Sequence, residues 1–173
     1  MKKNTLILYS TTDGQTIVIC EKIMSVLEKK STADILPLSE IENLNLRSYN
    51  QIIVGASIRY GKHKPELYHY VNLYKDELQS MKNGFFSVNV VARKTNKNTP
   101  ETNPYMKKFL TNSVWKPNNL AVFAGKLNYP KYNFIDKQMI RLIMLITKGP
   151  TNIKEVFEFT DWHQVELFAQ EFL

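Results

Sequence analysis

Short apolar runs alternate along this chain with longer segments in which apolar and polar residues are mixed. The runs cover residues 5–10, 33–38, 51–57, 85–91 and 120–125. Nearly continuous apolar runs of this length are typical of strands buried on both faces of a parallel sheet. Five strands separated by helices predict an α/β fold with a doubly wound parallel sheet and right-handed crossovers.

The segments between the runs show the three- and four-residue apolar spacing of helices. Ile19 and Ile23 mark a first helix. A second is expected over residues 65–81, with Pro65 in its first turn, where no helical hydrogen bond is lost. A third helix is expected around residues 105–110. Thr160 or Asp161 is expected to cap a final helix whose apolar residues share one face: Trp162, Val165, Phe168, Ala169 and Phe172.

One segment, residues 126–150, breaks the alternation after the fifth run. Its sequence is KLNYPKYNFIDKQMIRLIMLITKGP, and apolar residues fall on most faces of the helix that it predicts. Such a helix is not stable alone in water, so it covers a ligand, meets another chain or lies in a membrane surface. The alternative is an additional core helix packed on the sheet. We therefore expect one domain over residues 1–173 with a long apolar and basic insert at 126–150.

The net charge of +7 is concentrated in two segments. Residues 93–108 hold five basic residues against one acidic residue, and residues 126–148 hold the same excess. A regional excess of positive charge indicates an anionic partner, which is nucleic acid, an acidic lipid surface or a polyanionic small molecule. Nucleic acid is not expected, because the basic segments adjoin an apolar helix and no recognition motif is present.

Cysteine and histidine are scarce in this chain. The single cysteine, Cys20, excludes an internal disulfide, indicates a reducing compartment and sits in an apolar helical pattern that places it in the core. With the three histidines it shows no metal-ligand spacing, so no metal site is expected. We see no signal peptide and no run of about 20 apolar residues, and we expect a protein of the cytoplasm or the membrane periphery.

Three of the apolar runs end in segments suited to bind a ligand. In a sheet of strand order 2-1-3-4-5, ligands bind beyond the carboxyl ends of the first and third strands, with the fourth nearby. The first segment, STTDGQT at residues 10–16, combines four hydroxyls with Gly14 before a helix, so amides and hydroxyls can surround a phosphate. It lacks the lysine of nucleoside-triphosphate loops. The alternative is an ordinary turn in which Thr12 or Asp13 caps the helix.

The second and third segments are suited to a flat ring. GASIRYG, residues 55–61, contains Tyr60, which can stack on a ring, and VNVVARK, residues 88–94, offers backbone groups to a ring edge. The alternatives are a strand that ends in an exposed turn and an ordinary buried strand with its loop. Because the three segments are expected to converge at one edge of the sheet, together they predict a phosphorylated flat cofactor.

These residues resemble a known family. TLILYSTTDGQT is similar to the phosphate loop of flavodoxin-like proteins. Together with GASIRYGKH, FFSVNVVARK, TPETNPYMKKFL, NYPKY and YNFIDKQMIRLIM it resembles, over nearly the whole chain, the quinone-dependent, flavodoxin-like protoporphyrinogen IX oxidases of bacteria. The resemblance implies a flavodoxin-like fold, FMN as cofactor, protoporphyrinogen IX as substrate and a respiratory quinone, menaquinone or ubiquinone, as electron acceptor in haem biosynthesis. We expect a cytoplasmic protein held peripherally on the inner face of the cell membrane, and a homo-oligomer stays open.

Carried over by position, the resemblance implies two groups of FMN-binding residues. The phosphate is held by Ser10, Thr11, Thr12, Asp13, Gly14, Gln15 and Thr16. The isoalloxazine is flanked by Ser57, Ile58, Arg59, Tyr60, Gly61, Asn89, Val90, Val91, Ala92 and Arg93. We expect the insert to form a lid and a membrane-facing mouth, where an arginine fork suits the propionates of a porphyrinogen. The expected substrate residues are Arg59, Arg93, Lys94, Tyr129, Lys131, Tyr132 and Arg141.

The catalytic residues stay open, since no side chain is required as an acid or a base. His63, Tyr60 and Tyr129 are candidates by residue type, and His63, within KHKP, is expected to be solvated. Two other functions also stay open. A flavodoxin that acts only as an electron carrier would need no substrate pocket and is usually acidic, unlike this chain. A flavin-free adaptor on a membrane would be colourless after purification.

Overall fold

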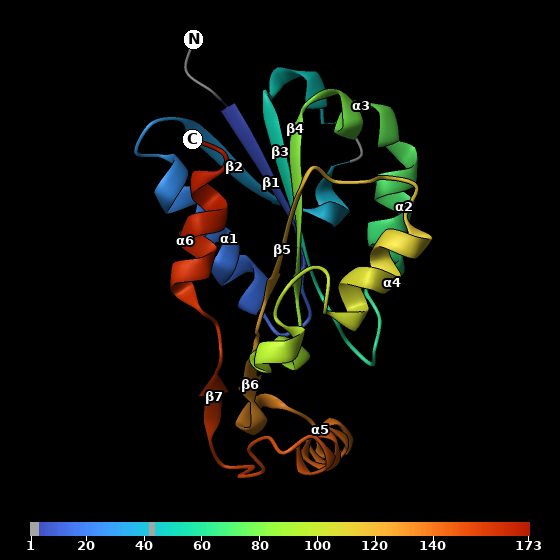
Figure 1. Ribbon diagram of the computed structural model, residues 1–173, viewed down its shortest axis with the longest axis vertical. Helices are drawn as coiled ribbons and strands as arrows, with labels where there is room; N and C mark the ends of the chain where they lie inside the picture. Colours follow the sequence, from blue (N-terminus) through green and yellow to red (C-terminus); the bar gives the residue numbers. More distant parts are fainter. Residues whose placement is uncertain (1–3, 42–43) are drawn as a thin grey trace.

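The protein, described here from a computed structural model over residues 4–41 and 44–173, is built around a five-stranded parallel sheet (Figure 1). The strands are β1 (Asn4–Ser10), β2 (Thr32–Pro37), β3 (Gln51–Ser57), β4 (Lys82–Val88) and β5 (Asn119–Phe123), in the order β2-β1-β3-β4-β5. The predicted α/β fold and strand order are confirmed. Because Ser10 pairs with Ala56, and Val88 pairs with both Ser57 and Phe123, the carboxyl ends of four strands lie level.

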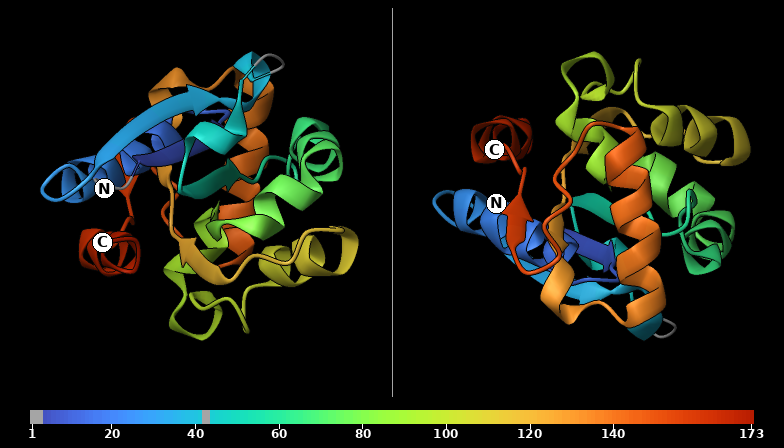
Figure 2. Two further views of the ribbon diagram at one scale, coloured as in Figure 1. Left: turned by 90° about the horizontal axis from the view of Figure 1, so that it is seen from above. Right: turned by 90° about the horizontal axis from the view of Figure 1, so that it is seen from below.

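Helices cover both faces of the sheet. On one face lie α1 (Gln15–Leu27) and α6 (Trp162–Gln170), and on the other α2 (Pro65–Leu73), α3 (Lys75–Ser80) and α4 (Pro104–Asn112) (Figures 1 and 2). Successive strand residues alternate between two hydrophobic clusters, so that Ile7 and Phe86 face α1 and α6 while Leu8 and Phe85 face the opposite layer. Both faces are buried, which explains why the strands read as continuous apolar runs.

Several local expectations are confirmed. Cys20 lies on the buried face of α1 as expected, and burial raises the pKa of its thiol. Of the two residues proposed to cap the last helix, Asp161 does so, because its side chain accepts hydrogen bonds from the amides of His163 and Gln164. Thr160 instead donates its hydroxyl to the carbonyl oxygen of Ala124 at 2.9 Å.

Two predicted elements differ from the structure. The helix expected over residues 65–81 is broken at Tyr74, whose φ of −110° and ψ of 24° lie outside the helical range. The strand expected over residues 85–91 instead begins at Lys82 and ends at Val88. It ends there because the side chain of Asn89 accepts a hydrogen bond from the amide of Ala92, which turns the chain into the 3-10 helix η3 (Val90–Arg93). Further 3-10 helices are η1 (Leu38–Glu40), η2 (Leu46–Ser48) and η4 (Thr95–Lys97).

The insert follows β5, and its first and last segments pair with each other as two short antiparallel strands. β6 (Lys126–Asn128) pairs antiparallel with β7 (Val156–Glu158), and between them lie η5 (Tyr129–Lys131) and α5 (Phe134–Ile146). The departing segment therefore continues past residue 150. Seen from below, α5 runs across the carboxyl ends of the strands instead of packing on a face of the sheet (Figure 2). The alternative of an additional core helix is thus not what the structure shows. Among residues 4–41 and 44–173, no helix has both the length and the apolar character needed to span a bilayer.

Candidate functional site

The loop between β1 and α1 ends in helix amides that no side chain caps. Gly14 occupies the cap position with a φ of 90°, a left-handed conformation that favours glycine. Its amide donates to the Thr11 hydroxyl oxygen at 3.1 Å. The alternative in which Thr12 or Asp13 caps the helix is wrong, since α1 has no side-chain cap. Uncapped amides at the start of a helix offer a binding position for an anion.

The four hydroxyls of this loop have four different environments. Ser10 donates to the Glu66 carboxylate, Thr11 accepts from Gly14, and Thr12 is exposed. Thr16 is fully buried, and its hydroxyl has no hydrogen-bond partner within the described part of the chain. The Ser57 hydroxyl, at the end of β3, is likewise buried and unpartnered. Because buried polar atoms are nearly always bonded, these two hydroxyls are available to a polar ligand bound at the strand ends.

Both hydroxyls line a small cavity of about 50 Å³. Its wall combines the β1 loop with the ends of β3 and β4 and the start of β6. The hydroxyl of Thr16, the uncapped amides of α1 and this small volume together fit a phosphate group. A larger cavity of about 550 Å³ shares Asp13, Ile58, Asn89, Val90 and Lys126 with the small one, so the two adjoin.

The larger cavity lies between the β3 and β4 loops and beneath α5. Tyr60, Gly61 and Val91 line it from the two loops, and Leu127 and Tyr132 from the insert. Helix α5 closes it with an apolar surface of Met139, Ile140, Ile143 and Met144. The arrangement suits a flat, largely apolar ring system whose polar end reaches the small cavity.

A tight turn presents the β3 loop to this cavity. Arg59 and Lys62 exchange both backbone hydrogen bonds, at 3.0 and 3.2 Å, around Tyr60 and Gly61. Both central residues have positive φ, 50° and 76°, as a two-residue turn of type I′ requires. The turn leaves Tyr60 62% exposed, with its hydroxyl bonded to Asp136 of α5.

The segment that follows this turn supports the β1 loop from the side. Lys64 donates from its ammonium group to the Thr11 carbonyl oxygen at 2.6 Å, and Glu66 accepts from Ser10. Arg59 forms an ion pair with Asp13 at 3.0 Å. Sequence reasoning missed Lys64 and Glu66, because the β1 loop contains no lysine and nothing in the local pattern brings a later segment to it.

Arg59 stands between two carboxylates from distant segments. It bonds Asp13 of the β1 loop and, at 2.6 Å, Asp136 of α5. Burial lowers the pKa of Arg59. The charges of Asp13 and Asp136 and the contact with Tyr60 raise it by more, so the pKa of Arg59 lies above its ordinary value. The hydrogen bond from Tyr60, together with Arg59, lowers the pKa of Asp136, whereas burial raises the pKa of Asp13 against the effect of Arg59.

The β4 loop is held by a buried polar network. Asn89 accepts from the amide of Ala92 and from Asn103, and donates to Ser87. The His63 ring nitrogen Nε2 lies 3.0 Å from the Ser87 hydroxyl. The expectation that His63 is solvated is wrong: it is 3% exposed, and burial together with the charge of Lys108 lowers its pKa to about 4. The neutral ring therefore belongs to the support of this loop.

Most of the predicted FMN-binding residues line one of the two cavities. Those that do are Thr11, Asp13, Gln15, Thr16, Ser57, Ile58, Arg59, Tyr60, Gly61, Asn89, Val90 and Val91. Those that line neither are Ser10, Thr12, Gly14, Ala92 and Arg93. The side chain of Asn89 is already fully engaged, which leaves the hydrophobic side chains and backbone of this loop to face a ring.

The predicted substrate residues are more scattered. Arg59 and Tyr132 line the larger cavity, whereas Arg93, Lys94, Tyr129, Lys131 and Arg141 do not. Tyr129 is fully buried and donates to the Pro150 carbonyl oxygen at 2.8 Å, and Lys131 and Arg141 are exposed on the insert. Sequence reasoning missed Lys126 and Tyr105, which do line the cavity.

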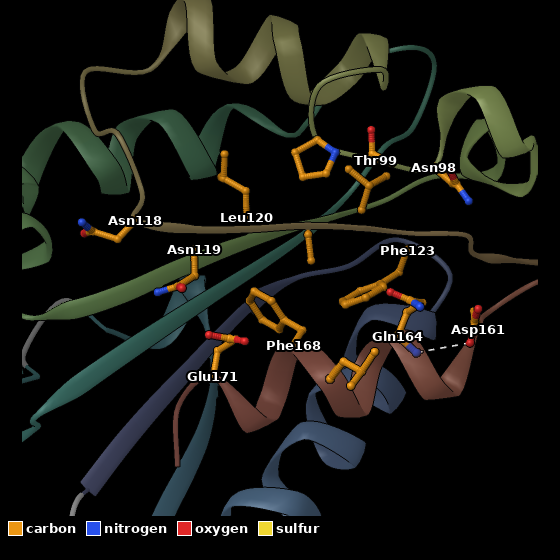
Figure 3. A pocket seen from close by; sticks show the side chains of 14 residues that line it. Asn98, Thr99, Asn118, Asn119, Leu120, Phe123, Asp161, Gln164, Phe168 and Glu171 are labelled. Carbon is orange, nitrogen blue, oxygen red and sulfur yellow. Dashed lines mark hydrogen bonds between the residues drawn. The ribbon is translucent and has the colours of Figure 1, made fainter.

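A third cavity, of about 660 Å³, lies along the outer edge of β5 (Figure 3). It is walled by Asn119, Leu120 and Phe123 of the strand, by Gln164 and Phe168 of α6 and by the loop at residues 98–100. None of the buried unpartnered side-chain atoms identified in residues 4–41 and 44–173 belongs to its wall. Within the same residues, no group of three or more histidine, cysteine, aspartate or glutamate side chains is placed to hold a metal ion. The strand-end cavities are therefore the candidate site.

Comparison with known proteins bears on this site. Residues 6–154 match the family described as flavodoxin domain. The chain is 44% identical over 168 residues to protoporphyrinogen IX dehydrogenase (quinone) of Escherichia coli K12, an alignment that covers 96% of this chain and 93% of the relative. It is 43% identical over 169 residues to a protein of that name from Leishmania major, covering 96% and 73%.

Solved structures share the fold at low sequence identity. Rubredoxin oxygen:oxidoreductase from Desulfovibrio gigas has a TM-score of 0.52 at 13% identity, covering 98% of this chain and 35% of that chain. Oxidised flavodoxin 1 from Bacillus cereus has a TM-score of 0.50 at 13% identity, covering 98% and 97%. The predicted flavodoxin-like architecture is therefore confirmed.

Proposed function

The chain belongs to the flavodoxin-domain family of quinone-dependent protoporphyrinogen IX dehydrogenases, and we propose that it oxidises protoporphyrinogen IX to protoporphyrin IX with FMN as cofactor and a respiratory quinone as acceptor. The relatives that carry this activity in their names match the chain along nearly its whole length. The alternative of a flavodoxin that only carries electrons is not favoured by these relatives. The observation that supports the proposal most is an apolar cavity, covered by α5, that adjoins the small cavity at the Thr16 hydroxyl.

The residues present fit FMN. We assign the phosphate to the small cavity, where the α1 amides and the unpartnered hydroxyl of Thr16 can bind its oxygens. The ring belongs in the larger cavity between Ile58–Gly61 and Val90, with Tyr60 available for stacking. Asp13 and Lys64 act indirectly, by holding the β1 loop through Arg59 and the Thr11 carbonyl.

Bound FMN supplies a two-electron acceptor for the oxidation. Conversion of the porphyrinogen to the porphyrin removes six electrons and six protons, so each turnover takes three cycles and reduces three quinones to quinols. The chain itself binds and orients the substrate and, through the apolar surface of α5, excludes water from the cavity. We assign a carboxylate of the substrate to Lys126, which lines the wall of the larger cavity.

Anaerobic mixing of the FMN-loaded protein with protoporphyrinogen IX tests this proposal. We expect the flavin absorbance to bleach while porphyrin fluorescence appears, and the flavin absorbance to return when quinone is added. A sample that receives quinone without porphyrinogen is the control. Flavin that stays oxidised in the presence of porphyrinogen would contradict the assignment.

We also propose that the outer surface of α5 docks on an anionic lipid surface at the inner face of the cell membrane. Its exposed apolar residues are Phe134 (76%), Ile135 (69%), Leu142 (57%), Leu145 (67%) and Ile146 (72%). The basic residues Lys131, Arg141 and Lys148 are exposed beside them. Apolar side chains ringed by positive charge suit insertion among acidic head groups.

Vesicle flotation distinguishes a lipid surface from a second copy of the chain as the occupant of this surface. We expect binding to vesicles that contain phosphatidylglycerol and much weaker binding to phosphatidylcholine alone. The double variant Leu145→Ser with Ile146→Ser should lose binding, and Leu167→Ser, at a 40% exposed position of α6, should keep it. A homo-oligomer that dissociates in the double variant, with no vesicle binding by the parent protein, would instead assign the surface to a second copy.

A further inference from the structure

We propose that Arg59 and Arg93 hold α5 by its two ends and so position the cover of the cavity, rather than binding the carboxylates of the substrate. The inference takes from the proposed function that the cavity beneath α5 is the site of oxidation. Their positive charge alone would suggest that both arginines bind the substrate. In the structure, however, Arg59 bonds Asp136 and Arg93 bonds Thr147, both in or beside α5.

Packing by itself does little to hold α5 in place. Of its thirteen residues, only Asp136 and Met144 are buried. Met144 joins a small cluster with Leu127, Tyr129 and Tyr132, and Ile140 packs partly buried against it, while the other large apolar side chains of α5 are exposed. Because hydrophobic stabilisation follows the apolar area removed from water, so sparse a contact leaves the orientation of the helix to its polar attachments.

The first attachment is at the start of α5. The Asp136 carboxylate accepts from Arg59 at 2.6 Å, from Asn133 at 2.9 Å and from the Tyr60 hydroxyl. The Arg59 and Asp136 side chains are only 19% and 12% exposed, and the guanidinium lies over the ring of Tyr132. A charge-assisted contact of this kind, shielded from water and shared among several donors, is stronger than an exposed ion pair.

The second attachment is at the end of α5. Arg93 donates from Nη2 to the carbonyl oxygen of Thr147 at 3.0 Å and lies 2.8 Å from its hydroxyl, while Nη1 donates to Val90 at 3.1 Å. Thr147 is the C-terminal cap of the helix, where carbonyl groups lack helical partners and a cation is favoured. A side chain at Gly149 would lie 2.8 Å from Arg93 and 2.6 Å from Met144, so glycine keeps this approach open.

The two attachments come from the two loops between which the cavity lies. Arg59 belongs to the β3 loop and Arg93 to the β4 loop, the two segments expected to flank the flavin ring. The helix therefore spans the cavity from one wall to the other, with Ile140 and Ile143 between the fixed ends. Arg59 also holds Asp13 of the phosphate loop, so its loss should affect both FMN and the insert, whereas loss of Asp136 or Arg93 should affect the insert alone.

Hydrogen exchange tests the attachments without depending on turnover. In Asp136→Asn and in Arg93→Met we expect α5 amides near the altered end to exchange about tenfold faster or more, since the first change removes the charge and one of the two acceptor oxygens and the second removes the donor. Protection in β1 to β5 and FMN affinity, measured by flavin fluorescence, should stay within about threefold of the parent. Arg93→Lys, which keeps one donor, should be intermediate. Glu166→Gln, which breaks the exposed Lys22–Glu166 pair, and Arg47→Met are the matched controls.

A second measurement separates positioning from substrate binding. We expect both variants to lose the same factor in kcat/KM with protoporphyrinogen IX and with its dimethyl ester. A loss that disappears with the ester would show that the guanidinium groups bind the carboxylates and would overturn the proposal. Unchanged exchange of α5 in Asp136→Asn and Arg93→Met would overturn it as well. If the chain oxidises no porphyrinogen at all, the exchange result still decides whether the attachments exist.

Discussion

Helices α5 and α6 have similar local signals and different surroundings. Each begins at a side-chain cap, Asn133 in α5 and Asp161 in α6, and each carries apolar side chains at helical spacing. Yet α6 buries Val165, Phe168 and Ala169 against the sheet, whereas α5 buries one carboxylate and one methionine. Apolar residues at helical spacing thus specify a helix but not what covers it. The sheet covers α6, and a cavity and polar attachments at both ends define the position of α5.

Excision of the insert should have the largest effect on activity. Replacing residues 127–157 by a short glycine linker joins Lys126 to Glu158, which face each other across β6 and β7. We expect porphyrinogen oxidation to fall at least about a hundredfold, because the cover that excludes water and orients the substrate is gone. The sheet and the phosphate loop should remain. Porphyrin fluorescence in the FMN-loaded variant measures the loss, and intact turnover would refute the role of the insert.

Truncation in the two helices should give opposite results. Phe168→Ala in α6 removes a ring that packs on Phe86 and Phe123, and should lower the free energy of unfolding by about 3–5 kcal/mol. Leu142→Ala in α5 removes an exposed side chain and should change it by no more than about 0.5 kcal/mol. Denaturant titration of both variants checks the pair. A comparable loss in Leu142→Ala would mean that α5 packs as a core helix after all.

Acidification should destabilise the buried network around His63. The contact of Arg59 with Asp136 should persist, because the pKa of Asp136 is lowered. The pKa of His63 is about 4 in the folded protein, below the ordinary value of 6.5, so the unfolded chain binds more protons between these values. Stability contributed by the neutral ring is complete above about pH 6.5 and is lost as the pH falls towards 4, by about 3 kcal/mol in all.

Urea titrations at several pH values measure this contribution as the difference between the parent and His63→Gln. The variant should lose this part of the pH dependence, and His69→Gln, at an exposed position of α2, should retain it. An identical slope in the parent and His63→Gln would contradict the assignment of the buried neutral ring.

A modest effect is expected in the loop after β1, which adjoins the sheet and is not part of the insert. Thr16→Val keeps the shape of the side chain and removes its unpartnered buried hydroxyl. FMN should bind about tenfold more weakly, while the flavin-free protein gains about 1 kcal/mol of stability because no buried polar atom is left unbonded. Thr12→Val, at an exposed position, is the control. Unchanged FMN affinity in Thr16→Val would place the phosphate elsewhere.

Much of this protein could be read from local pattern. The five strands followed from apolar runs such as residues 51–57, since burial on both faces of a sheet imposes a local signature. Their order, and with it the convergence of three loops, came from the doubly wound topology and the resemblance to flavodoxin-like proteins. The resemblance of the chain to its family came from the same loops. The break at Tyr74 and the end of β4 at Val88 were missed, because each depends on one residue's backbone or hydrogen bond.

Local pattern was enough to predict the sheet, a loop of hydroxyls and glycine after β1 and an apolar helix after β5. What each charged and polar side chain does there became clear only from the folded chain. Arg59 reaches Asp136 across 77 positions, Arg93 reaches Thr147 across 54, and His63 is buried against Ser87. Apolar periodicity depends on neighbours along the chain and can be read directly. The partner of an arginine depends on which distant segments the fold brings together, and no local pattern records that.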